Sequence, residues 1–184
     1  MRHRLLKILG IALQVVGALA LMGVVAFAVM VFPWFRSSSP KIDHITPENA
    51  MFVLDWGQIG DKSKIRRVLH SYESPRSFTG DGVEAYCLQI DHFPEEVVRK
   101  DDSGREMWLR PPLDDALLVE ALNTASMMVH SDNLAWFPSA KMLNSDGFYL
   151  NFWTIVAHNQ MVTTVQLIAY DRKERKIYYA NVKW

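Results

Sequence analysis

The hydrophobic pattern divides the chain into two dissimilar parts, and the first is one long apolar run. Residues 8–35 carry no charged side chain, and Gln14 is their only strongly polar residue. A soluble helix would show polar positions on its solvent face, whereas a helix that crosses the ~30 Å hydrocarbon core of a membrane needs about 20 apolar residues. The run therefore predicts a transmembrane helix at residues 8–35, with Trp34 and Arg36 at its far interface.

The charges that flank this run predict its orientation. Residues 1–7 form a short basic tail with Arg2, Arg4 and Lys7, which the positive-inside rule places in the cytoplasm. Residues 48–184 are then exported behind a linker at residues 36–47, into the periplasm if the source is bacterial. A cleaved signal peptide is the alternative, because residues 26–28 have the small-x-small form of a cleavage site. We favour an uncleaved anchor, since the apolar run exceeds the core of ~7–15 residues typical of such peptides.

One face of the predicted membrane helix carries small and polar residues. Gly10, Gln14, Gly17 and Leu21 follow one another at spacings of four, three and four, so they share a helix face. Glycines allow close backbone approach, and a glutamine can hydrogen-bond across a helix pair, which makes this face a candidate contact for homo-oligomerisation. The alternative is that the Gln14 amide reaches the headgroups and that the glycines have no special role.

The second part alternates short apolar segments with polar turns, as a folded domain with strands and helices does. Apolar runs and alternating β-branched or aromatic residues predict strands at residues 50–56, 83–90, 148–157, 162–170 and 177–182. Helical spacing, with Asp61 as a cap and a Pro-Pro pair at a start, predicts helices at residues 62–72 and 113–129. Short links indicate that the last strands form an antiparallel meander. We therefore expect an α+β domain, an antiparallel sheet with two main helices on one face.

Composition and charge narrow the functional classes. Of the 184 residues, 49% are apolar, which excludes a disordered chain, and the single Cys87 excludes a disulfide scaffold. The overall charge is zero, yet residues 37–184 hold 16 basic and 20 acidic side chains, a net charge of −4. Nucleic-acid binding needs a basic face, so we expect no nucleic-acid partner. Cys87 lies in an alternating segment, which predicts a small buried strand residue.

Candidate chemistry is sparse. The chain has no GxSxG, P-loop, GxGxxG, HExxH or CxxC motif. Adjacent carboxylates occur at residues 95–96, 101–102 and 114–115. Neighbouring side chains point in different directions, so these pairs are not expected to act together in catalysis, and acidic residues also suit the start of a helix. Apart from His3 in the N-terminal tail, the histidines fall in different predicted elements, with no pair at helical spacing: His44, His70, His92, His130 and His158. We therefore assign no catalytic, cofactor-binding or metal-ligating residue and expect no cofactor.

Two segments could contact a partner. Residues 71–82 combine hydroxyls, Arg76, Asp81 and two glycines, which suits either a binding loop or a helix-to-strand turn. Trp136 and Phe137 stand before a proline among polar turns, which suits either an exposed aromatic anchor or the plug of a core. The aromatic-rich C-terminal sheet could also leave an edge that pairs with another strand.

These observations predict a non-catalytic exported domain on a single-pass anchor that binds another envelope protein. Assembly factors and toxin-immunity proteins both fit this description. One alternative is a membrane-tethered envelope hydrolase that uses a hydroxyl from residues 71–77, His92 or His130, and Asp81. Another is a constitutive structural subunit of a membrane complex, held through the face of Gly10 and Gly17.

Overall fold

The computed structural model describes residue 17 and residues 20–27, 45–60, 64–75, 77, 80–98, 107–159 and 161–184, and the chain divides into two units, Met1–Ser39 and Pro40–Trp184. In the first unit the described residues are helical, and apolar side chains such as Leu21 and Phe27 are exposed. None of the described helices is long and apolar enough to span a membrane. The predicted membrane helix at residues 8–35 lies largely outside the described residues, so the anchor stays a prediction.

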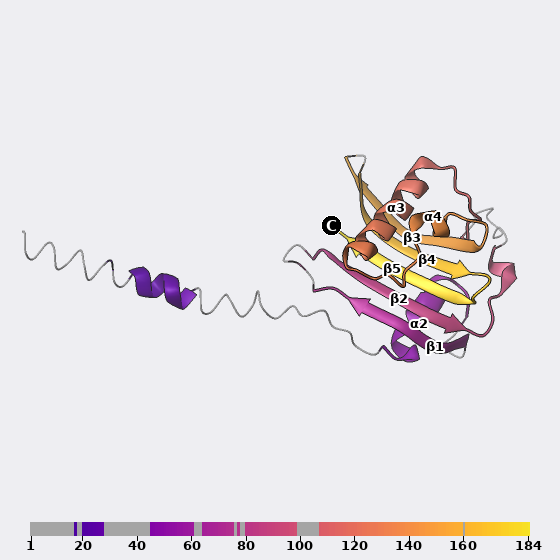
Figure 1. Ribbon diagram of the computed structural model, residues 1–184, viewed down its shortest axis with the longest axis horizontal. Helices are drawn as coiled ribbons and strands as arrows, with labels where there is room; N and C mark the ends of the chain where they lie inside the picture. Colours follow the sequence, from indigo (N-terminus) through magenta and orange to yellow (C-terminus); the bar gives the residue numbers. More distant parts are fainter. Residues whose placement is uncertain are drawn as a thin grey trace, which may run out of the picture. The chain divides into compact units, whose positions relative to one another are not determined.

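The second unit is built on a five-stranded antiparallel sheet with the strand order β1-β2-β5-β4-β3 (Figure 1). The strands span Ile65–Glu73 (β1), Gly82–Ile90 (β2), Phe148–His158 (β3), Met161–Asp171 (β4) and Lys176–Lys183 (β5). The expected α+β class and C-terminal meander are confirmed. The final strand pairs with β2 as well as β4, so it is central, and the edge strands are β1 and β3.

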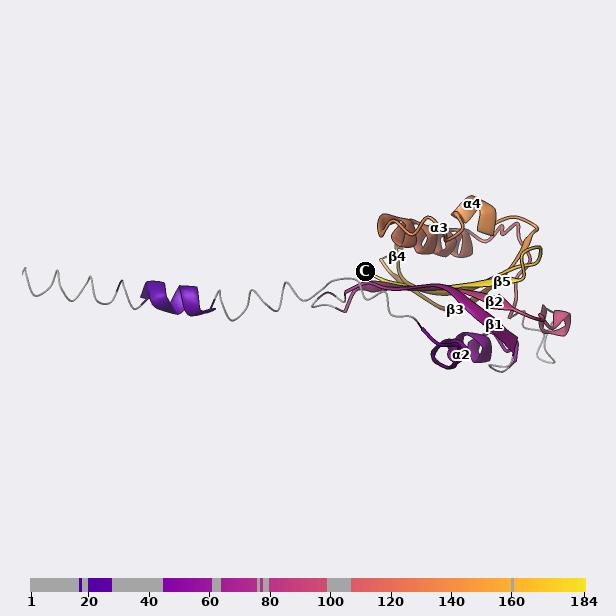
Figure 2. The same cartoon turned by 60° about the horizontal axis from the view of Figure 1, so that its bottom comes forward.

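Helices lie on both faces of the sheet (Figure 2). α3 (Ala116–Ser131) and the short α4 (Ala140–Leu143) lie on one face, and α2 (Pro47–Trp56) lies on the other, with a separate apolar core under each. The expectation that the two main helices share one face is wrong, because the two longest helices of this unit, α2 and α3, lie on opposite faces. Four consecutive β5 residues at positions 177–180 are buried, and a strand that is buried on both sides needs a covering layer on each.

Residues 50–56, predicted as a strand, belong to α2. Pro47 stands at the start of the helix, where its missing N–H costs nothing. The buried side chains then follow at helical spacing: Ala50, Val53 and Leu54. A short apolar run suits a buried strand and a buried helix equally, so its pattern did not separate the two. The helix ends at Gly57, whose N–H donates to the Val53 carbonyl at 3.1 Å.

Residues 62–72, predicted as a helix, instead contribute most of β1. Ile65, Val68 and Leu69 have the i, i+3, i+4 spacing of a helix face. In the sheet this spacing arises from two β-bulges, one between Ile65 and Arg67 and one between Val68 and His70. Each bulge adds a residue and shifts the alternation of side chains. Val68 thus packs against the core on the α2 face, while Leu69 packs against the core on the α3 face.

α3 confirms the second predicted helix with a later start. Asp115 is its N-cap, and the Asp115 carboxylate accepts the Leu118 N–H at 3.0 Å. The two prolines at residues 111–112 therefore precede the helix. Its buried face includes Ala121 and Leu122, whereas Leu117 is 46% exposed.

Truncation of Leu54 tests the packing of α2 on the sheet. This side chain is 0% exposed, so Leu54→Ala should leave a cavity and lower the free energy of unfolding by about 2–5 kcal/mol. The neighbouring Asp55→Ala, at an exposed position, should stay within about 0.5 kcal/mol of the wild type. Urea unfolding followed by tryptophan fluorescence measures both. Equal stability of the two variants would contradict the packing of α2.

Candidate functional site

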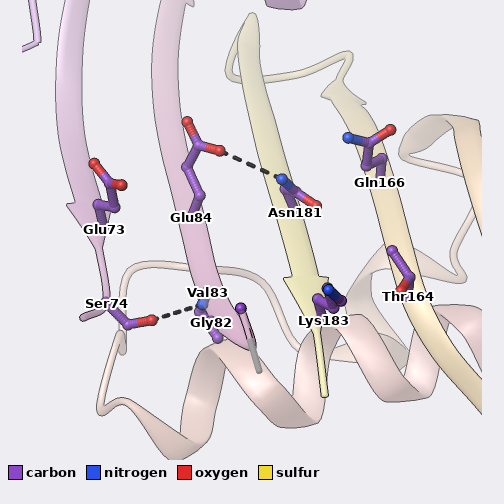
Figure 3. Close-up of a pocket in the computed structure, with 10 residues that line it drawn as sticks. Glu73, Ser74, Gly82, Val83, Glu84, Thr164, Gln166, Asn181 and Lys183 are labelled. Atoms are coloured by element: carbon purple, nitrogen blue, oxygen red, sulfur yellow. Dashed lines mark hydrogen bonds between the residues drawn. The ribbon is translucent and has the colours of Figure 1, made fainter. Parts of the chain in front are cut away.

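The sheet face that carries α2 has an uncovered polar part. A cleft of about 400 Å³ opens there, lined by Glu73, Ser74, Gly80, Gly82, Val83, Glu84, Thr164, Gln166, Asn181 and Lys183 (Figure 3), and we call it the polar cleft. The strand register explains its composition. Glu73 lies opposite Glu84, Glu84 opposite Asn181, and Asn181 opposite Gln166, so one polar row crosses β1, β2, β5 and β4.

Glu84 lies where the polar cleft meets the apolar core. Its carboxylate accepts hydrogen bonds from the Tyr86 hydroxyl and, at 3.4 Å, from the Asn181 amide (Figure 3). Burial of the ring, together with this hydrogen bond and the negative charge of Glu84, raises the pKa of Tyr86 far above its usual value. The phenol therefore stays protonated and continues to donate to Glu84, which fixes the carboxylate in place.

A layer of aromatic rings packs between α2 and the sheet. Tyr86 and Tyr179 stack with ring centroids 5.5 Å apart, and Phe52 packs edge-on against both. On the same helix, Trp56 stacks on Trp153 of β3 at 5.7 Å. This layer joins α2 to the central strands and to one edge strand, so it holds the helix in a defined position on the face.

The Tyr179 hydroxyl has no hydrogen-bond partner among the described residues, although Tyr179 is only 1% exposed. Burial, and then the negative charge of Glu84, raise the pKa of Tyr179. A buried hydroxyl without a partner costs about 1–3 kcal/mol. Tyr179 therefore carries an unused donor within electrostatic reach of the cleft carboxylate.

The polar cleft holds two carboxylates and one ammonium group. Glu73 and Glu84 face each other across the β1–β2 ladder, and like charges directly opposite destabilise a sheet. Lys183 lies near the end of β5, opposite Gly82. The carboxylates thus gather on β1 and β2, while the amides occupy β5 and β4. This arrangement offers acceptors to a cationic group and both donors and acceptors to a neighbouring polypeptide.

The segment at residues 71–82 forms the end of β1 and the turn into β2, so it joins two strands. The Ser77 hydroxyl donates to the Asp81 carboxylate at 3.1 Å and accepts the Asp81 N–H at 2.9 Å. The Ser74 hydroxyl accepts the Val83 N–H at 2.7 Å (Figure 3). These bonds close the turn and position one wall of the polar cleft. Arg76 lies outside the described residues.

A second groove, of about 320 Å³, is lined by Ile45, Val68, Leu69, His70, Ser71, Tyr72, Leu134 and Trp136, and we call it the β1-edge groove. Trp136 stacks on His70 with ring centroids 5.0 Å apart and contacts Phe137 edge-on at 5.9 Å. Phe137 is 2% exposed, whereas Trp136 is half-buried. The two predicted roles are thus divided: Phe137 plugs the core, and Trp136 reaches the surface.

The structure separates Asp81 from His92, two residues of the hydrolase alternative. Asp81 precedes β2 and His92 follows it, so the length of a nine-residue strand, roughly 30 Å, lies between them. The His130 Nδ1 atom lies 2.7 Å from the Ser126 carbonyl oxygen, one turn earlier in α3. Among the described residues, no group of three His, Cys, Asp or Glu side chains could hold a metal ion.

The other sequence candidates have structural roles where the structure describes them. Cys87 is the predicted buried strand residue, and burial raises its pKa to about 11, which keeps the thiol protonated. Glu95 accepts the Tyr149 hydroxyl at 3.0 Å, and Asp115 caps α3. His158 is exposed at the end of β3. His44 and residues 101–102 lie outside the described residues.

The sequence pattern indicated one wall of the polar cleft, at residues 71–82, but not its strand residues Glu84, Gln166 and Asn181. Glu84, Gln166 and Asn181 each occupy one position in a strand whose neighbours are mostly apolar, which is the ordinary pattern of solvent-facing strand residues. Only the insertion of β5 between β2 and β4 brings these side chains into one row. Comparison with protein-family models, with curated proteins and with solved structures finds no significant match to this chain.

The two stacked tyrosines make a matched pair of variants. Tyr86→Phe removes the donor to Glu84 and should lower the free energy of unfolding by about 1–2 kcal/mol, whereas Tyr179→Phe removes an unpartnered buried hydroxyl and should be neutral or stabilise by up to about 1 kcal/mol. Urea unfolding measures both. A Tyr179→Phe variant as unstable as Tyr86→Phe would show that the Tyr179 hydroxyl has a partner in the free protein.

Proposed function

We propose that the protein is a single-pass membrane protein whose exported α+β domain binds another envelope protein in the polar cleft without catalysing a reaction. The observation that carries this proposal is the polar row across β1, β2, β5 and β4 on the uncovered part of the α2 face. Assembly factors and toxin-immunity proteins remain the two classes that fit it.

The chemistry of the polar cleft favours a positively charged segment of the partner. Glu73 and Glu84 lie directly opposite each other in the register, which concentrates two carboxylates at one place in the cleft. A lysine or arginine side chain placed between them would make charge-assisted contacts with both. The Asn181 and Gln166 amides lie alongside and suit the backbone of the same segment.

The aromatic layer supports a binding role for a second reason. It holds α2 in place, and the Tyr86 hydroxyl of this layer fixes the Glu84 carboxylate of the polar cleft. A site whose groups are already held in position loses little conformational freedom on binding. Recognition at this site therefore needs no rearrangement of the sheet.

Site-specific photo-cross-linking in the protein's own membranes tests this proposal. A photoreactive residue in place of Gln166, in the polar cleft, should yield one defined adduct. The same residue in place of Met127, which is 59% exposed on α3, is the matched control and should yield none. The Glu73→Gln/Glu84→Gln variant should reduce the adduct about tenfold, which corresponds to ~1.4 kcal/mol of binding free energy.

Two outcomes would contradict the proposal. One is equal cross-linking from both positions, and the other is an adduct that persists when both carboxylates are neutral. A form that begins at Ser37 and is exported by a cleavable signal should give the same adduct, because the recognition surface lies in the second unit. Loss of the adduct in that form would assign recognition to the N-terminal segment.

A further inference from the structure

β1 is an edge strand bordered by apolar side chains on both faces of the sheet. Among the described residues it pairs with β2 alone (Figure 1). The β1-edge groove includes Ile45 and Val68, which pack on the α2 side, and Leu69, Leu134 and Trp136, which pack on the α3 side. An edge strand presents backbone N–H and C=O groups, and apolar walls on either side suit the side chains of an added strand.

The bulge at the centre of β1 decides which strand can be added. Leu69 and His70 are consecutive, yet both lie on the α3 side: Leu69 packs against the core there, and His70 stacks on Trp136 and pairs with Cys87 of the same core. The side chains therefore point to the same sequence of faces in both directions from the Leu69–His70 bond. The next residues outward, Val68 and Ser71, lie on the α2 side. The residues after those, Arg67 and Tyr72, lie on the α3 side.

This symmetry favours a second copy of the same strand over an ordinary one. In antiparallel pairing, residues that are directly opposite point to the same face. A regular strand loses that match at the bulge, because one of its residues faces two on β1. A second β1 with the same bulge at the same place keeps the match on both sides of it.

We propose that two copies of the chain associate through their β1 edges, antiparallel, about a two-fold axis beside the Leu69–His70 bond. The two sheets then form one continuous sheet with five strands from each copy. A contact of this kind uses the same surface on both subunits, so it closes as a dimer and does not extend into a fibre. The dimer contact shares Glu73 with the polar cleft, and its other residues lie outside that cleft.

Charged and aromatic groups match in this pairing. Arg66 and Arg67 lie near the start of β1 and Glu73 at its end, and neither arginine forms an ion pair with a described residue. Antiparallel pairing places Arg66 of one copy opposite the partner's Glu73 at both ends of the contact. It also places Arg67 opposite the partner's Tyr72, where a guanidinium can lie over the ring. Parallel pairing would instead place like charges together.

Cysteine cross-linking of the full-length protein in detergent tests the contact. His70→Cys puts a thiol beside the proposed axis, and the native Cys87 is only 2% exposed and does not compete. Mild oxidation should convert most of this variant into a disulfide-linked dimer on a non-reducing gel. His158→Cys is the matched control, since it makes the same substitution at an exposed position on the other edge strand, and it should remain monomeric.

Charge reversal gives a second readout that leaves the His70–Trp136 stack intact. Arg66→Glu reverses one charge in each of two symmetric contacts, so the dissociation constant of the dimer should rise about tenfold. The double variant Arg66→Glu/Glu73→Arg restores opposite charges and should return the constant to the wild-type value. Sedimentation equilibrium of the full-length protein measures both.

Three results would overturn the proposal. Equal cross-linking of His70→Cys and His158→Cys is the first, and an unchanged dissociation constant in Arg66→Glu is the second. The third is a combination of two results: the Gly10→Leu/Gly17→Leu variant is monomeric, and the His70→Cys variant gives no cross-link. That combination would assign association to the N-terminal segment. Because these measurements need no partner protein, their failure leaves the proposed function of the polar cleft standing.

Discussion

The contact between the aromatic side chains of α2 and the central strands determines the layout of the whole domain. Phe52 packs on Tyr86 and Tyr179, and Trp56 stacks on Trp153, so one short helix is fixed to β2, β5 and β3 together. Because α2 has only ten residues, it covers part of its face. The uncovered part has to be polar, and the polar cleft begins where the Tyr86 hydroxyl meets a carboxylate.

Two surfaces with different chemistry result from this arrangement. The polar cleft lies on a sheet face and presents carboxylates and amides that already have defined positions, which suits recognition of a charged segment. The β1-edge groove lies at the rim of the sheet and combines apolar walls with a bulged backbone. A bulge protects an edge from unspecific pairing, yet it also selects a strand that carries the same irregularity. One domain can therefore bind a partner and a second copy of itself at different places.

Sequence patterns predicted four strands and one helix correctly. They predicted a strand for residues that belong to α2 and a helix for residues that belong to β1. The strands of the C-terminal meander and β2 are long, aromatic and β-branched, so local preference and final structure agree. The apolar run at residues 50–56 is too short for periodicity to separate a helix from a buried strand. In β1 the two bulges gave Ile65, Val68 and Leu69 a helical spacing. The segment at residues 71–82, predicted as a binding loop or a turn, supplies one wall of the polar cleft. Glu84, Gln166 and Asn181 were not predicted as site residues, because each looks like an ordinary solvent-facing strand residue.

The sequence by itself determined the α+β class, the antiparallel C-terminal strands and the burial of Cys87, because these depend on composition and on side chains close together along the chain. Only the tertiary structure decided the position of β5 between β2 and β4, and with it the row of Glu73, Glu84, Asn181 and Gln166. The physical reason is that strand order and register depend on packing between residues about 100 positions apart, which no local pattern records.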